Sequence, residues 1–282
     1  MGRLLLATLG AGVLALALSA TTDGPVKPRL ATDSPSVTIP LTSPATVPRT
    51  PRAARRPAPA SVRLTTIEGL GDSVPAATGC SCTSYITLLA DALGQLQGTS
   101  VAAANDAQNG QTSLGLLIQV RREATRATTD RMTVVTIGAN DFDEGRLSGP
   151  GCTSDEDLAC YQGELASLGT NVAALLAILA PPGQPHGPVV VTGYWNVFLD
   201  GDVGASQGGA YVRDSDTLTR VVNQVLSDAS RRAGVAYLDL YTPFHTQAGG
   251  VTRLLAPDGD HPSAAGHALI TSLLTAAVLR LG

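Results

Sequence analysis

The feature that most constrains the fold is a regular alternation of short apolar runs with longer stretches of helical periodicity, between residues 63 and 281. Residues 63–70, 101–104, 132–137, 189–192 and 235–238 are strand-like, and residues 85–96, 112–126, 158–179, 215–232 and 263–281 have helical spacing of apolar side chains. Strands that alternate with helices form a parallel sheet with helices on both faces. The sequence therefore predicts a three-layer α/β/α domain around a mostly parallel five-stranded sheet.

Only part of the 282 residues has this pattern. Residues 1–20 carry an arginine and then an apolar run that ends in small residues, which predicts a secretory signal peptide. An uncleaved membrane anchor is the alternative, although the run is at the lower limit of length for spanning a bilayer. Residues 21–62 are rich in Thr, Pro, Ala and Arg and lack periodicity, so we expect a disordered linker. It is either a spacer associated with a cell wall or a solvated tail, and residues 63–282 form the folded domain.

The charge of the folded part argues against a nucleic-acid partner. Residues 63–282 hold 12 of the 19 basic residues and 21 of the 23 acidic residues, a net charge of −9. A domain of that sign repels the phosphate backbone.

Three separated motifs supply the groups of an acyl-transfer site. Ser73 lies in Gly71-Asp72-Ser73-Val74, and Asp258 lies three residues before His261 near the C-terminus. A serine hydroxyl needs an adjacent base, usually an imidazole oriented by a third group, to act as a nucleophile. We therefore expect Ser73 to attack, His261 to transfer the proton and Asp258 to orient the imidazole. Asp260 is the alternative orienting carboxylate.

An oxyanion hole is expected from the residues that follow the first three strand-like runs. Asn140 offers a side-chain amide, and Ser73 and Gly110 offer backbone N–H groups, with no Cβ on Gly110 to block a ligand. The carboxyl ends of parallel strands open on one crevice, so these three residues are expected to lie together.

On these residues the chain resembles the SGNH subgroup of the GDSL esterase/lipase family, whose four named residues match Ser73, Gly110, Asn140 and His261. The resemblance covers residues 63–282 and implies the flavodoxin-like SGNH-hydrolase fold. It also implies hydrolysis of carboxylic esters through an acyl-serine intermediate, without a cofactor. Val74 replaces the leucine of the GDSL motif, which removes no catalytic atom. Pro75 occupies the last glycine position of the Gly-x-Ser-x-Gly elbow, which disfavours the α/β-hydrolase fold.

Four cysteines fit an oxidising destination. Sequence leaves three pairings open. We prefer Cys152 with Cys160, because so short a loop closes readily, and this leaves Cys80 with Cys82. A redox or zinc role is the alternative, although no histidine lies at ligand spacing from either pair.

The remaining candidates concern the substrate and metals. Tyr194, Trp195 and Phe198 follow the fourth strand-like run, where they either line a substrate pocket or pack beneath a surface loop. The Asp-Gly-Asp turns at 200–202 and 258–260 do not complete an EF-hand pattern, so no metal is assigned. His186 and His267 have no obvious chemical partner, His245 near Phe244 is a candidate for the rim of the site, and none of the three receives a catalytic role.

Together these features predict a monomeric carboxylic ester hydrolase, secreted or at the cell surface, that acts on small-molecule or lipid esters. The first alternative is an acetyl esterase that acts on polysaccharide, and the second is a catalytically silent surface-binding domain. With an unperturbed His261, activity is expected to decline below pH about 6.5.

Overall fold

A computed structural model of the chain describes residues 63–123 and 128–281. The predicted signal peptide and linker, residues 1–20 and 21–62, lie outside the described residues.

The described chain contains a five-stranded sheet in which every neighbouring pair of strands is parallel. Its order is β2-β1-β3-β4-β5, so the chain reverses direction across the sheet between β2 and β3. The strands are β1 (Thr66–Gly71), β2 (Ala102–Asn105), β3 (Arg131–Thr136), β4 (Val189–Thr192) and β5 (Ala236–Leu238). All five lie within three residues of the predicted positions, and the predicted fold class is confirmed.

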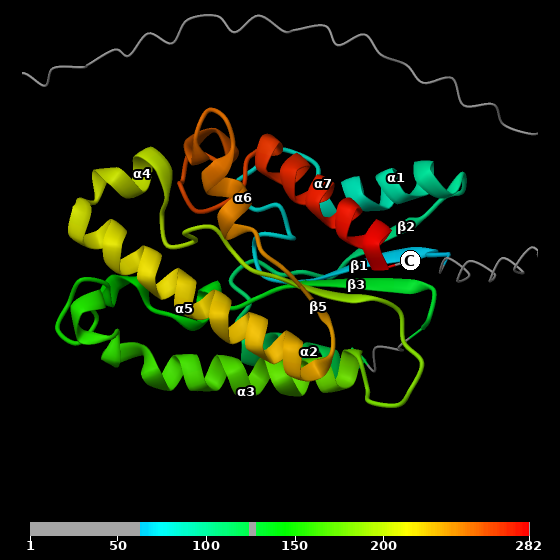
Figure 1. The fold of residues 1–282 in the computed structure, drawn as a ribbon, viewed down its shortest axis with the longest axis horizontal. Coiled ribbons are helices and arrows are strands. Elements are labelled where there is room, and N and C mark those ends of the chain that lie inside the picture. Colours follow the sequence, from blue (N-terminus) through cyan, green and yellow to red (C-terminus); the bar gives the residue numbers. More distant parts are fainter. Residues whose placement is uncertain (1–62, 124–127, 282) are drawn as a thin grey trace, which may run out of the picture. The chain divides into compact units, whose positions relative to one another are not determined.

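Helices cover both faces of the sheet (Figure 1). The helices α1 (Tyr85–Gln97) and α7 (Ala264–Leu281) pack together on one face. The other face is covered by α2 (Ser113–Glu123), α3 (Gln162–Leu179) and α5 (Gly209–Ala233), and α3 contacts both of its neighbours. Two short helices complete the set, α4 (Gly201–Ser206) and α6 (Tyr241–Thr246). Short 3₁₀ turns lie at Ala139–Asp141, Glu144–Arg146, Ser154–Glu156, Ala159–Tyr161 and Val251–Leu254.

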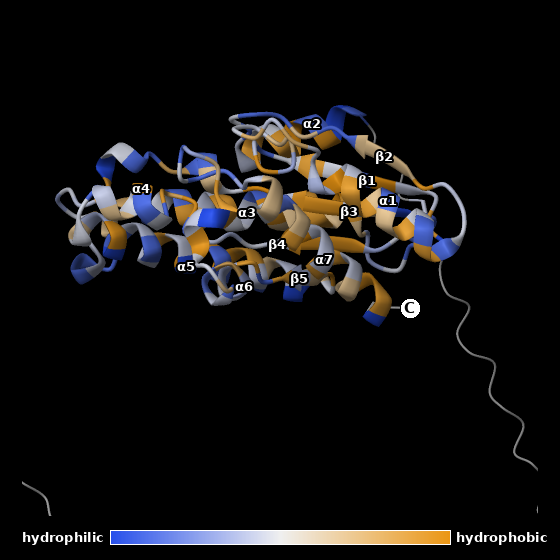
Figure 2. Ribbon diagram, turned by 90° about the horizontal axis from the view of Figure 1, so that it is seen from above, coloured by the Kyte–Doolittle hydropathy of each residue, from blue (hydrophilic) through white to orange (hydrophobic). Residues whose placement is uncertain are grey.

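The centre of the sheet is apolar, with one buried ion pair (Figure 2). Glu68 of β1 is buried and lies in register with Thr133 of β3. Its carboxylate accepts hydrogen bonds from Arg131 at 2.7 Å and from the Thr133 hydroxyl at 2.9 Å. A buried carboxylate is costly unless it is paired in this way. The pair therefore ties the two central strands together.

The helix boundaries differ from the prediction in understandable places. The helix α5 begins six residues before the expected start, and buried Asp214 in its second turn accepts hydrogen bonds from Ser148 and Ser154. The segment 158–161 is a 3₁₀ turn in which Leu158 is left-handed, so α3 itself starts at Gln162. The helices α4 and α6 have six residues each, too few for a periodic signal.

The helix α3 and the 3₁₀ turn before it, Ala159–Leu179, are long and apolar enough to cross a bilayer by length and composition. In the structure, Leu165, Leu168, Val172 and Leu176 are buried, and α3 packs between α2 and α5. This is the arrangement of a core helix of a folded domain.

Candidate active site

The serine of the first motif lies in a turn directly after β1 (Figure 1). Gly71 has φ +137°, and a Cβ there would overlap the carbonyl oxygen of Thr136, so only glycine fits between the two strands. The backbone N–H of Asp72 donates to that same carbonyl at 3.0 Å, and the Asp72 carboxylate accepts from the N–H of Val74 at 3.0 Å. This Asx turn leaves Ser73 half-buried at the carboxyl end of the sheet.

Asp72 itself is completely buried. Burial raises the pKa of Asp72 to about 6, although hydrogen bonds from the Tyr194 hydroxyl and the Val74 amide oppose the rise. Tyr194 follows β4, so this bond ties the nucleophile turn to the end of a second strand.

The expected oxyanion donors lie after β2 and β3. The N–H of Gln108 donates to the carbonyl of Gly71 at 2.9 Å, which places the Gly110 loop beside the nucleophile turn. Gly110 is exposed with φ +74°, and a Cβ there would meet no atom within 4 Å. The Asn140 side chain donates to the carbonyl of Gln111 at 3.1 Å. An amide nitrogen carries two hydrogens, so one N–H of Asn140 remains for a ligand.

Asp141 fixes the position of Asn140. Its carboxylate accepts the backbone N–H of Ser113 at 2.9 Å and also binds the Ser113 hydroxyl. Ser113 is the first residue of α2, so a residue that follows β3 caps the helix that follows the Gly110 loop. Burial raises the pKa of Asp141, although the two bonds from Ser113 oppose it.

The histidine motif forms a tight loop before α7. The N–H of Ala256 donates to the carbonyl of His261 at 2.8 Å, and the Nδ1 atom of His261 is 3.0 Å from Oδ2 of Asp258. Oδ1 of Asp258 accepts the backbone N–H of His261 at 3.2 Å. Oδ1 of Asp260 is 2.9 Å from the same ring nitrogen. The structure therefore brings both alternatives, Asp258 and Asp260, to His261.

These carboxylates change the protonation of the imidazole. Partial burial lowers the pKa of His261, but the contacts with Asp260 and Asp258 outweigh burial and raise it to about 9. Burial also opposes ionisation of Asp258, but the hydrogen bonds from His261 lower its pKa. The expected value near 6.5 for His261 was therefore wrong, because sequence could not show two carboxylates at one nitrogen.

The nucleophile turn and the histidine loop are in contact. The N–H of Thr78 donates to the carbonyl of Ser73 at 3.0 Å, and a Cβ on the next residue, Gly79, would lie 3.0 Å from Cβ of His261. Among the described residues Ser73 and His261 share no hydrogen bond, and such bonds often form only in the complex with substrate. The hydroxyl, the imidazole and the two loops of oxyanion donors thus lie at one edge of the sheet.

This arrangement agrees with what the chain matches in sequence. The family model of the GDSL-like lipase/acylhydrolases matches residues 70–269, more than half of the chain and all of the motifs described above. The chain belongs to this family. Members of the GDSL family are carboxylic ester hydrolases, so the chain is a GDSL esterase/lipase family hydrolase. A comparison with curated proteins gave no match.

Solved structures share the fold of this GDSL-family chain. A lipase from a goat rumen metagenome is 16% identical with a TM-score of 0.58, over 75% of this chain and 96% of its own. A lipase/acylhydrolase from Enterococcus faecalis is 18% identical with a TM-score of 0.51, over 76% and 95%. An acetylxylan esterase from Geobacillus stearothermophilus is 13% identical with a TM-score of 0.54, over 78% and 96%.

The aromatic residues after β4 pack inside the GDSL domain. Tyr194 and Trp195 are fully buried and Phe198 is 3% exposed, so they leave almost no surface for a ligand. The Trp195 ring stacks on Phe244 with centroids 4.4 Å apart, and its indole N–H donates to the carbonyl of Asp260 at 3.1 Å. The structure therefore does not support the expected pocket role. Their burial agrees with the alternative, in which the three side chains pack beneath a loop. The hydrogen bond from Trp195 supports the histidine loop.

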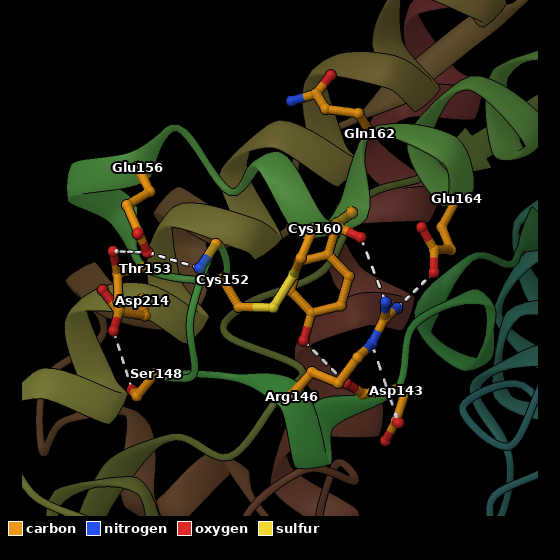
Figure 3. The surroundings of a disulfide bond; sticks show 12 residues. Asp143, Arg146, Ser148, Cys152, Thr153, Glu156, Cys160, Gln162, Glu164 and Asp214 are labelled. Atoms are coloured by element: carbon orange, nitrogen blue, oxygen red, sulfur yellow. Dashed lines mark hydrogen bonds and ion pairs between the residues drawn. A yellow bond between two sulfur atoms is a disulfide. The ribbon is translucent and has the colours of Figure 1, made fainter.

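The sulfur atoms of Cys152 and Cys160, and those of Cys80 and Cys82, lie at bonding distance in the structure, and the pairing preferred from sequence stays a prediction. The first disulfide closes a loop that follows the Asn140 turn, and Figure 3 shows the polar contacts around it. Arg146 donates to the carbonyl of Cys160 at 3.2 Å and pairs with Glu164 at the start of α3.

Sequence spacing did not reveal the environment of the second disulfide. His267 of α7 is buried, and one of its ring nitrogens lies within 4.8 Å of the sulfur atoms of Cys80 and Cys82. Burial, and to a lesser extent the nearby His261, lower the pKa of His267 to about 4. Three such groups can hold a metal only when both cysteines are thiolates, which the disulfide prevents.

Proposed function

We propose that this chain is a serine esterase in which Ser73 forms the acyl intermediate. Ser73 Oγ attacks the ester carbonyl carbon while Nε2 of His261 takes its proton, and the alcohol leaves with that proton as the tetrahedral intermediate collapses. Water then repeats the sequence and releases the acid. The observation that carries the proposal is the contact between the Ser73 turn and His261, whose opposite nitrogen is held by Asp258.

The oxyanion of each tetrahedral intermediate is proposed to bind three N–H groups, from the Asn140 side chain and from the backbones of Ser73 and Gly110. The free N–H of Asn140 supports this assignment, and so does the open, left-handed backbone at Gly110. Removing one such donor costs roughly 10²–10³ in kcat.

The proposal is tested by hydrolysis of short and long nitrophenyl esters. The Ser73→Ala variant is expected to lose at least about 10³-fold in kcat, whereas Ser167→Ala, an exposed serine of α3, retains the parent rate. Equal rates for Ser73→Ala and the parent would remove the mechanism and favour a silent binding domain.

We also propose that small-molecule or lipid esters are the substrates and that the active form is a monomer. Lipases among the similar structures support this proposal. The acetylxylan esterase among them favours the second candidate, deacetylation of polysaccharide. Nitrophenyl esters of increasing chain length, assayed beside acetylated xylan, separate the two by kcat/KM. Size-exclusion chromatography with light scattering tests the monomer.

Export remains part of the proposal. It is supported by the apolar run in residues 1–20 and by two disulfides in the described domain. Mass spectrometry of the protein recovered from culture medium is expected to find an N-terminus close to Thr21, followed by the linker that associates with the cell wall or extends into solvent. An intact Met1 in the membrane fraction would instead indicate an anchor.

A further inference from the structure

Two carboxylates meet one nitrogen of His261. Oδ2 of Asp258 lies 3.0 Å and Oδ1 of Asp260 lies 2.9 Å from Nδ1. An imidazole carries at most one hydrogen at this atom, and that hydrogen can point at only one of the two oxygens at a time.

The two carboxylates differ in how they are bonded. Asp258 accepts both the ring N–H and the backbone N–H of His261, so it orients the ring. Oδ1 of Asp260 is buried, lies at ion-pair distance from Nδ1 and has no hydrogen-bond partner among the described residues. Its contact with His261 is therefore mainly electrostatic.

The loop is built so that Asp260 stays there. Gly259 has φ +85°, which lets the chain turn between the two aspartates. Its carbonyl accepts the N–H of Asp200 at 2.8 Å, and the carbonyl of Asp260 accepts the indole N–H of buried Trp195 at 3.1 Å. Both bonds come from the segment after β4, so the position of Asp260 depends on the core and not on the loop alone.

We propose that Asp260 is a positioning residue of the active site, a second carboxylate that acts with Asp258 on Nδ1 of His261. This assignment rests on the proposed function, in which His261 is the base. Asp258 aligns the imidazole, and the charge of Asp260 stabilises the imidazolium that forms when Ser73 gives up its proton. Because either carboxylate can neutralise the imidazolium, loss of Asp258 alone is partly compensated.

Other titratable groups near His261 have pKa values that differ enough from that of His261 for their titrations to be distinguished. Asp72 from the nucleophile turn and His267 from α7 interact electrostatically with His261. Their pKa values are about 6 and about 4, whereas that of His261 is about 9. A change in the midpoint of the rising limb near pH 9 therefore reports on His261 and its two carboxylates.

The test compares pH profiles of kcat/KM for the full chain, measured with EDTA so that no cation bound between the carboxylates contributes. Asp260→Asn is expected to move the midpoint of the rising limb down by about one pH unit, as loss of a neighbouring opposite charge does. Asp258→Asn is expected to lower the plateau by roughly 10- to 100-fold, and the double variant by roughly 10⁴-fold. The matched control, Asp91→Asn on the exposed surface of α1, removes the same charge and is expected to leave the profile unchanged.

Titration of the His261 ring by NMR in Ser73→Ala protein tests the same point without catalysis, with the signal assigned by His261→Gln. Adding Asp260→Asn is expected to lower the measured pKa of His261 by about one unit. If the pKa and the limb do not move, or if Asp260→Asn lowers kcat without moving them, Asp260 has only a structural role and the proposal fails. An active Ser73→Ala variant would instead refute the proposed function, and this titration would still measure the effect of Asp260.

Discussion

At the scale of single residues, the site depends on a few positions where the chain has no freedom. Gly71 fits against the carbonyl of Thr136, and Gly79 fits against Asp258 and His261. The charge around His261 is the second feature of this scale, because Asp258 and Asp260 hold it in the protonated form at neutral pH. Each of these two features leads to a testable prediction.

The first prediction concerns pH. A general base must be neutral, and His261, with a pKa of about 9, is neutral only at alkaline pH. We expect kcat/KM to increase with pH, by about tenfold per unit below pH 9, and to level off above it. Initial rates with a soluble nitrophenyl ester between pH 6 and 10, corrected for spontaneous hydrolysis, measure this profile. A midpoint near 6.5 would show that the two aspartates do not stabilise the imidazolium.

The second prediction concerns Gly79. Alanine at this position would have to adopt a left-handed backbone, which is strained for a residue with a Cβ. Its Cβ would also lie against Asp258 and His261. We expect Gly79→Ala to lower kcat by at least about tenfold, because a small displacement of a catalytic group is costly. Gly98→Ala is the matched control: φ is +63° and its Cβ meets nothing within 4 Å, so only the backbone strain is shared. Equal kcat values for the two variants would mean that the histidine loop tolerates the contact.

At the scale of elements, the site is held by bonds between segments that follow different strands. Asp141, after β3, caps α2, and Tyr194, after β4, bonds to Asp72, after β1. The disulfide between Cys152 and Cys160 fastens the loop that leads from the Asn140 turn to α3. Loss of any of these bonds is therefore expected to change both the stability of the fold and the geometry of the site.

The third prediction concerns the cap on α2. Asp141→Asn removes the negative charge of the carboxylate that accepts hydrogen bonds from Ser113. This loss is expected to lower the free energy of unfolding by about 1 kcal/mol. The Asn140 turn loses the same support, so kcat is expected to fall as well. Urea unfolding and kcat are compared with those of Asp239→Asn, which removes the charge of the acceptor for the N–H of Tyr241 at the start of α6. The idea fails if both variants lose stability but keep kcat.

The fourth prediction concerns the longer disulfide. Cleavage followed by alkylation and peptide mass spectrometry without reductant is expected to find Cys152 linked to Cys160. Replacing both with serine is expected to lower the free energy of unfolding by about 2 to 3 kcal/mol, the loop-closure entropy of so short a loop. Free thiols at both positions in protein isolated from the medium would contradict this pairing.

At the scale of the whole molecule, the folded unit carries every group of the candidate site. The family match and the described contacts both lie within residues 63–281. Residues 21–62 are polar and proline-rich in sequence and offer no periodic apolar face.

The fifth prediction therefore concerns truncation. Residues 61–282 are expected to unfold within about 2 °C of the longer chain that begins at Thr21, since a segment without a core adds little to stability. Their kcat/KM values on soluble esters are expected to agree within about twofold. A large loss on truncation, measured by differential scanning calorimetry and initial rates, would mean that the linker packs on the domain.

Local patterns in the sequence were sufficient for much of this protein. Short apolar runs placed the five strands, and apolar periodicity placed the five long helices, because a helix buried on one face leaves a repeating signal along its length. The positions of Ser73, Gly110 and Asn140 after three strands, and of His261 before the last helix, predicted one shared edge, because parallel strands end together.

The folded chain decided what depends on contacts between distant segments. The left-handed Gly259 brings Asp260 beside Asp258 at one nitrogen, and burial turns Trp195 from an expected pocket residue into a support for that loop. The sequence offered Asp260 and the burial of Trp195 only as alternatives, and no local pattern could decide between those alternatives. The charge state of His261 belongs to the same class, because a pKa is set by every charge and every buried surface around the group, and these are assembled only when the chain folds.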